Sequence, residues 1–180
     1  MPNWPNNPLH RLSSAAAFLV TTATQHEAPL FRGELRLDFL QNTLVELAQQ
    51  FGWELQAWTI VPNHYHFIAI SPAPQTLHAL VEQFHAVTAR YLKQQDNSLG
   101  PRIWSPAGER FLSHENTYLS RLKDVHFNPV QHGLVRDAAR YPWCSAPWFA
   151  RKADRFFYQA IKNYPADGQK MVDFPCKTWK

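Results

Sequence analysis

Two runs of β-forming residues separated only by Pro62-Asn63 most strongly limit the folds open to this 180-residue chain. Residues 53–61 and 64–71 are rich in aromatic and β-branched side chains, and the Pro-Asn pair between them is typical of a turn. The sequence therefore predicts a β-hairpin, around which the other elements must be arranged.

An amphipathic helix is predicted on each side of this hairpin, because apolar residues recur at helical spacing over residues 34–51 and 77–91. A strand-like run at residues 15–22 precedes the first helix, and residues 103–112 could form a fourth, interrupted strand. The order βαββαβ predicts a ferredoxin-like α+β fold, in which two helices cover one face of an antiparallel sheet.

A third helix is predicted from Glu115 to about Phe127, where Pro129 is expected to end it. It is additional to the six ferredoxin-like elements and could lie against the free face of the sheet. We divide the chain into a polar, proline-rich arm (1–14), a main domain (15–149) and a basic and aromatic C-terminal extension (150–180).

Composition excludes several classes of protein. No run approaches the roughly 18 to 20 apolar residues of a membrane span, the N-terminus lacks the features of a signal peptide, and the two cysteines form neither a zinc motif nor a disulfide framework. We therefore expect a cytoplasmic protein with no membrane partner. The 18 Lys and Arg against 14 Asp and Glu give a formal charge of +4, which permits a polyanionic partner without requiring one.

The segment Pro62–Phe67 contains two histidines, His64 and His66, at alternate positions of a predicted strand. Side chains two residues apart on a strand share a face, so the two imidazoles can bind one divalent metal ion. The alternative is a pair of polar residues on a half-exposed strand. In either case we expect both histidines to be accessible to solvent, and Tyr65 to face the core.

The third predicted helix carries Asp124 and Asn128 one turn apart, and therefore on one face. If that face covers the sheet, Asn128 could offer its amide oxygen to the same metal ion, with Asp124 beside it. The alternatives are an ordinary helix-end asparagine before proline and a solvated acid.

Three segments resemble the REP-associated tyrosine transposases of the HUH nuclease class: WTIVPNHYHFIAISP, YLSRLKDVHFNPVQHGLV and YPWCSAPWF. The resemblance runs from about Leu12 to Phe149. It implies a ferredoxin-like domain with an added catalytic helix, acting in DNA transposition and recombination as a metal-dependent enzyme that cleaves and joins DNA strands. The implied partner is a DNA hairpin with a single-stranded flank, and the implied assembly is a monomer or homodimer. His64, His66 and Asn128 would hold Mg²⁺ or Mn²⁺, and a helix-borne tyrosine would attack the phosphodiester.

The chain departs from the family pattern at the nucleophile, because Asp124 stands where the family has tyrosine. An acyl phosphate formed on a carboxylate would be too labile to store a strand end. Tyr118 lies about 240° around the helix from position 124 and is expected in the core, whereas Tyr91 and Tyr141 remain open. Two alternatives to strand transfer follow: a DNA-binding regulator that does not cleave, and a phosphodiester hydrolase in which Asp124 and His66 activate water.

Basic residues near the second and third helices are candidates for DNA contacts, and we expect Arg102, Arg121, Lys123 and Arg136 among them. Cations that bind phosphates give salt-dependent affinity, and the aromatic residues of the extension could stack on unpaired bases. The alternative is that these charges only solvate the surface.

Overall fold

Four strands form one antiparallel sheet in the computed structural model, which describes residues 16–71, 73–96, 99–168 and 171–176. The strands are β1 (Ala16–Ala23), β2 (Glu54–Val61), β3 (His64–Ser71) and β4 (Gly108–Phe111). Their spatial order is β2-β3-β1-β4, with β2 and β3 joined as the predicted hairpin. The ferredoxin-like arrangement is therefore confirmed. The arm predicted at residues 1–14 lies outside the described residues.

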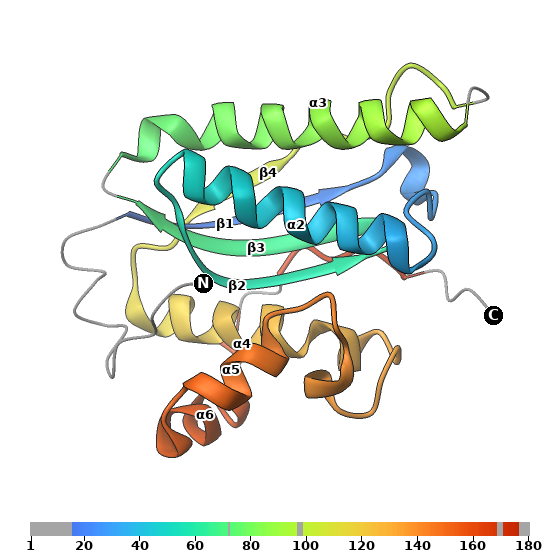
Figure 1. Cartoon of the computed structure of the whole chain (residues 1–180). Coiled ribbons are helices and arrows are strands. Elements are labelled where there is room, and N and C mark those ends of the chain that lie inside the picture. The colour runs from blue at the N-terminus through green and yellow to red at the C-terminus, as the bar shows by residue number, and fades with distance from the viewer. Residues whose placement is uncertain (1–15, 72, 97–98, 169–170, 177–180) are drawn as a thin grey trace.

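Helices cover both faces of the sheet (Figure 1). One face carries α2 (Glu34–Gln50) and α3 (Leu77–Gln95), and the other carries α4 (Glu115–Gln131), α5 (Ala146–Lys152) and α6 (Arg155–Lys162). Short 3₁₀ helices occur at Gln25–Glu27, Pro74–Thr76 and Ala138–Arg140. Among the described helices, none has the length and apolar character needed to cross a membrane.

The alternation of side chains along the strands divides the apolar interior into two clusters. Val20 and Phe67 belong to the cluster under α2 and α3. Their chain neighbours Leu19 and Ile68 belong to the cluster under α4, α5 and α6. Because His64 and His66 follow the same alternation as Ile68, they lie on the α4 face of the sheet.

The predicted end of the third helix near Phe127 was wrong, because α4 continues through Pro129 to Gln131. A proline inside a helix leaves the carbonyl four residues earlier without its N–H donor, here the carbonyl of Val125. The hydroxyl of Thr59, on β2, donates to that carbonyl oxygen at 2.5 Å. The sheet thus replaces the missing hydrogen bond, and Asn128 stays on a helix that faces the histidines.

The C-terminal part of the chain returns to the main domain. Helix α5 runs across the boundary that we placed between residues 149 and 150. On α6, Ile161 is buried in the same apolar cluster as Leu122 of α4. Beyond it, the segment 171–176 lies against the α4 face of the sheet, where Asp173 meets β3 (the red trace in Figure 1).

Candidate metal centre

His64 and His66 stand side by side on β3, with ring centroids 5.1 Å apart. Both are completely buried, so the expectation that they would be accessible to solvent was wrong. The reason is the C-terminal segment: the ring of Phe174 lies 5.7 Å from that of His64, and Asp173 contacts both imidazoles. Tyr65 points to the opposite face and is fully buried there, as predicted.

The carboxylate of Asp173 is the point on which the polar side chains of this site converge. Its Oδ1 lies 3.3 Å from Nε2 of His64, 3.1 Å from Nε2 of His66 and 3.2 Å from Nε2 of His132. Its Oδ2 accepts a hydrogen bond from Nδ2 of Asn128 at 3.2 Å. The predicted residues His64, His66 and Asn128 are therefore brought together, by a residue that the sequence did not single out.

Neighbouring side chains fix the orientation of the two histidine rings. Asn63 donates from Nδ2 to the carbonyl oxygen of Pro175 at 3.0 Å, so its Oδ1 faces Nδ1 of His64, also at 3.0 Å. An amide oxygen only accepts, so Nδ1 of His64 must be the donor and a neutral ring carries a lone pair on Nε2. On His66, Nδ1 lies 2.9 Å from the hydroxyl of Thr21.

The protonation states of His64 and Asp173 suit metal binding. Burial lowers the pKa of His64 to about 4, so this ring is neutral near pH 7. Burial alone would raise the pKa of Asp173, but hydrogen bonds with the rings of His132 and His66 hold it well below its usual range. A neutral imidazole beside an ionised carboxylate is the form in which these groups bind metal ions.

The unpaired atoms of the cluster agree with a cation site. Within the described part of the chain, Nε2 of His64 and Oδ1 of Asn128 are buried without a hydrogen-bond partner. A lone pair on Nε2 of His64 and a carboxylate oxygen 3.3 Å away repel each other unless a cation lies between them. Octahedral ligands about 2.1 Å from Mg²⁺ stand about 3 Å apart. His64, His66 and Asp173, whose ligand atoms all lie within 4.8 Å of one another, therefore fit a divalent cation.

Asp124 lies in the wall of a cavity of about 380 Å³ that Asp173 also lines. It forms an ion pair with Arg121, one turn earlier on α4. Burial raises the pKa of Asp124, and the Arg121 guanidinium offsets part of that rise. Asp124 and Asp173 therefore line the same cavity, with the Asp124 carboxylate paired to Arg121.

The four cations predicted to bind DNA occupy different environments. Arg121 is only 1% exposed, and its guanidinium also donates to Asp167 at 2.7 Å, so it connects α4 to the C-terminal part of the chain and is not at the surface. Lys123 donates to the carbonyl oxygen of Tyr164 at 2.6 Å. Arg102 and Arg136 are exposed.

The three tyrosines considered as substitute nucleophiles are engaged elsewhere. Tyr118 is buried in the cluster under α4, as expected. The ring of Tyr91 stacks on Phe39 with a centroid distance of 3.8 Å. The hydroxyl of Tyr141 donates to the carbonyl oxygen of Ile60 at 2.9 Å. None of these three tyrosines is therefore available to replace the tyrosine that the family pattern has at position 124.

Two residues of the cluster were missed in the sequence. His132 follows Asn128 by four positions and therefore shares its helical face, a spacing that could have identified it. Asp173 lies 107 residues after His66 in a segment without periodicity, and no pattern in the sequence points to it.

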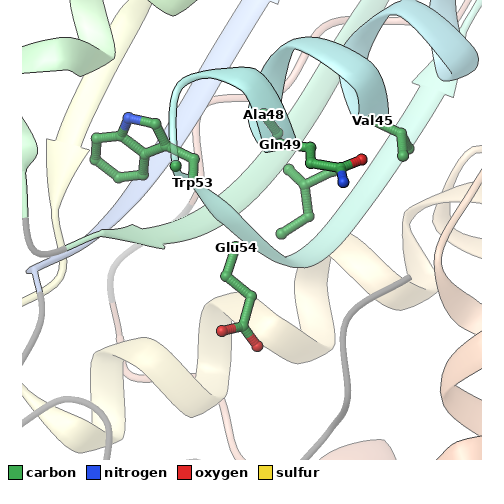
Figure 2. Close-up of a pocket in the computed structure, with 7 residues that line it drawn as sticks. Val45, Ala48, Gln49, Trp53 and Glu54 are labelled. Carbon is green, nitrogen blue, oxygen red and sulfur yellow. The ribbon is translucent and has the colours of Figure 1, made fainter.

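A different pocket, between the end of α2 and the start of β2, is shown in Figure 2. Its volume is about 320 Å³, and Glu54 is the only ionisable group among the described residues that line it. We therefore place the candidate functional site at the histidine cluster.

Comparisons with known proteins found a matching family, a similar sequence and a similar fold. The family described as "Transposase IS200 like" matches residues 14–112, which include both histidines of β3. The chain is 27% identical over 124 residues to the REP-associated tyrosine transposase of Escherichia coli (strain K12), covering 66% of this chain and 68% of that protein. A solved structure of a REP-associated tyrosine transposase bound to a REP hairpin superposes with a TM-score of 0.62, at 18% identity and covering 89% of this chain and 90% of that one.

Proposed function

Because the chain belongs to the IS200-like transposase family, we propose that it binds a DNA hairpin with a single-stranded flank and presents a phosphodiester of that flank to a divalent metal centre. The observation that carries the proposal is the convergence of the buried side chains of His64, His66 and Asn128 on the partly exposed carboxylate of Asp173, which creates an anionic site that fits Mg²⁺ or Mn²⁺. The similar structure of a REP-associated tyrosine transposase is bound to a REP hairpin.

The side chains of this centre have separable roles in the proposal. His64, His66, Asn128 and Asp173 would hold the ion, which when bound supplies Lewis-acid polarisation of a phosphate. Asn63, together with Thr21, orients the imidazoles so that their Nε2 atoms face one point. Such outer hydrogen bonds keep ligands in place and tune their basicity.

We further propose that strand transfer through a phosphotyrosine does not occur in this protein. Asp124 occupies the nucleophile position, its carboxylate is bound to Arg121, and a carboxylate repels a phosphodiester. We therefore expect the protein to bind DNA without cleaving it. Hydrolysis is the second candidate, because Asp124 and Asp173 line one cavity in which a carboxylate could accept a proton from water.

One experiment separates these outcomes. A labelled hairpin with a single-stranded flank is incubated with the protein and Mn²⁺, then analysed on native and denaturing gels. We expect a shifted, intact probe. Free 5′-phosphate ends would establish hydrolysis, and a covalent protein–DNA band would establish strand transfer and contradict the proposal.

Matched variants test which surface binds the DNA. Arg102→Gln and Arg136→Gln each remove an exposed cation that we predict to contact DNA, and Arg155→Gln removes an exposed cation from α6 as a control. We expect weaker binding and a smaller salt dependence from the first two, by about one phosphate contact each. If all three variants lose DNA affinity equally, binding depends only on the net charge of the protein and not on the positions of Arg102 and Arg136.

A further inference from the structure

A further cavity, of about 540 Å³, lies on the α4 face of the sheet between the β1–β4 pair and the C-terminal segment. Its lining includes Leu19 and Thr21 of β1, Gly108 of β4, and Met171 and Phe174 of the C-terminal segment. Leu19 pairs with Arg110 and Thr21 pairs with Gly108, and paired residues project to the same face. Arg110, which is exposed, therefore projects on the cavity side.

This cavity adjoins the metal centre directly. The hydroxyl of Thr21, in its lining, lies 2.9 Å from Nδ1 of His66. Phe174, in its wall, follows Asp173 in the chain and packs against His64. Met171 lines both this cavity and the one that contains Asp124, so the metal centre has a cavity on each side of the segment 171–174.

The chemistry of the lining suits one unpaired nucleotide. Leu19, Met171 and Phe174 provide apolar and aromatic surface, on which a base can stack. Arg110 provides a positive charge for a phosphate at the edge of the cavity. The volume is within the range of pockets that bind small organic ligands, about 300 to 1,000 Å³, and is too small for a segment of double helix.

We propose that this cavity binds the unpaired nucleotide next to the phosphodiester that lies at the metal centre. The inference rests on the proposed function, because it starts from a DNA strand held at the metal centre, which this cavity adjoins. It adds a nucleotide-binding subsite built by β1, β4 and the C-terminal segment.

Gly108 offers a way to fill the cavity without moving the backbone. A Cβ at this position would meet nothing closer than the carbonyl oxygen of Thr21 at 3.7 Å, which is an ordinary contact. Gly108→Trp therefore places an indole in the cavity, and Gly108→Ala is the matched control that adds only a methyl group. Arg110→Gln tests the charge, with Arg155→Gln as a distant control.

The test measures the affinity of each variant for a hairpin with its single-stranded flank and for the same hairpin without it. We expect Gly108→Trp to lose at least tenfold for the flanked hairpin while binding the flankless one within twofold of the wild type. Gly108→Ala should stay within twofold on both. Arg110→Gln should weaken binding of the flanked hairpin and lower its salt dependence.

An abasic series along the flank identifies the nucleotide. One abasic position should weaken binding by the wild type and by Gly108→Ala, and should have no further effect on Gly108→Trp. If Gly108→Trp binds the flanked hairpin like the wild type, or loses the flankless one equally, the subsite is wrong while hairpin binding stands. If the wild type binds neither DNA, the proposed function and the subsite both fail.

Discussion

Replacing Asp173 by asparagine tests the composition of the metal centre most directly. Asp173→Asn keeps the size of the side chain and removes the charge that faces three imidazole Nε2 atoms at 3.1 to 3.3 Å. Removing a side chain that only hydrogen-bonds to a metal ligand already lowers the metal affinity roughly 10- to 100-fold. We therefore expect a loss of at least that size for Mn²⁺, or about 1.4 to 2.7 kcal/mol.

The metal-free protein should respond much less to this change. The Asp173 side chain is 30% exposed, so its charge is partly screened by solvent. An asparagine Nδ2 can also donate a hydrogen bond to an imidazole Nε2 that carries a lone pair, which a carboxylate cannot do. We expect the free energy of unfolding without metal to change by no more than about 1 kcal/mol.

The assay is isothermal titration with Mn²⁺ at fixed pH, together with thermal unfolding in the presence and absence of the ion. Asp154→Asn is the matched control, because Asp154 caps α6 through bonds to Phe156 and Phe157, and asparagine caps a helix equally well. Wild-type Mn²⁺ affinity in Asp173→Asn would refute the reasoning. Asp173 would then only pack on the histidines.

Other predictions concern the histidines and the two charged residues of α4. His64→Ala and His66→Ala should each weaken Mn²⁺ binding at least tenfold in titrations and, because both rings are buried, lower the unfolding free energy by about 1 to 3 kcal/mol. Arg121→Gln should lower the free energy of unfolding by about 2 to 4 kcal/mol in denaturant titrations, because two carboxylates lose their partner. Arg136→Gln, at an exposed position, is the control and should lower the free energy of unfolding by less than about 0.5 kcal/mol. Asp124→Tyr should form a covalent DNA adduct on denaturing gels that the aspartate protein does not form, whereas an adduct in the aspartate protein would refute our placement of the nucleophile.

The predictable part of the fold is the part that local periodicity determines. The hairpin of β2 and β3 and the helices α2 and α3 follow from alternation and helical spacing within single segments. The end of α4 could not be predicted in this way, because Pro129 normally stops a helix. The hydrogen bond that compensates for it comes from Thr59, which is distant in sequence.

The same division holds for the site. His64 and His66 share a strand and Asn128 shares a helical face with position 124, so local geometry was enough to nominate them. Their burial and the carboxylate that joins them come from the segment around Asp173, more than a hundred residues after His66. Contacts made across such separations leave no periodic signal in a single sequence.

Asp124 also has a structural role that its position in the motif does not indicate. Arg121 is buried and is bound by Asp124 on one side and Asp167 on the other. A buried guanidinium needs carboxylate partners to offset its desolvation, so Asp124 contributes to holding the C-terminal part of the chain against α4. That part also carries Asp173 into the histidine cluster. Asp124 is thus coupled to the segment that completes the candidate metal centre. Asp124→Tyr should therefore weaken the attachment of this segment as well as supply a phenol, and any adduct should come with a lower free energy of unfolding.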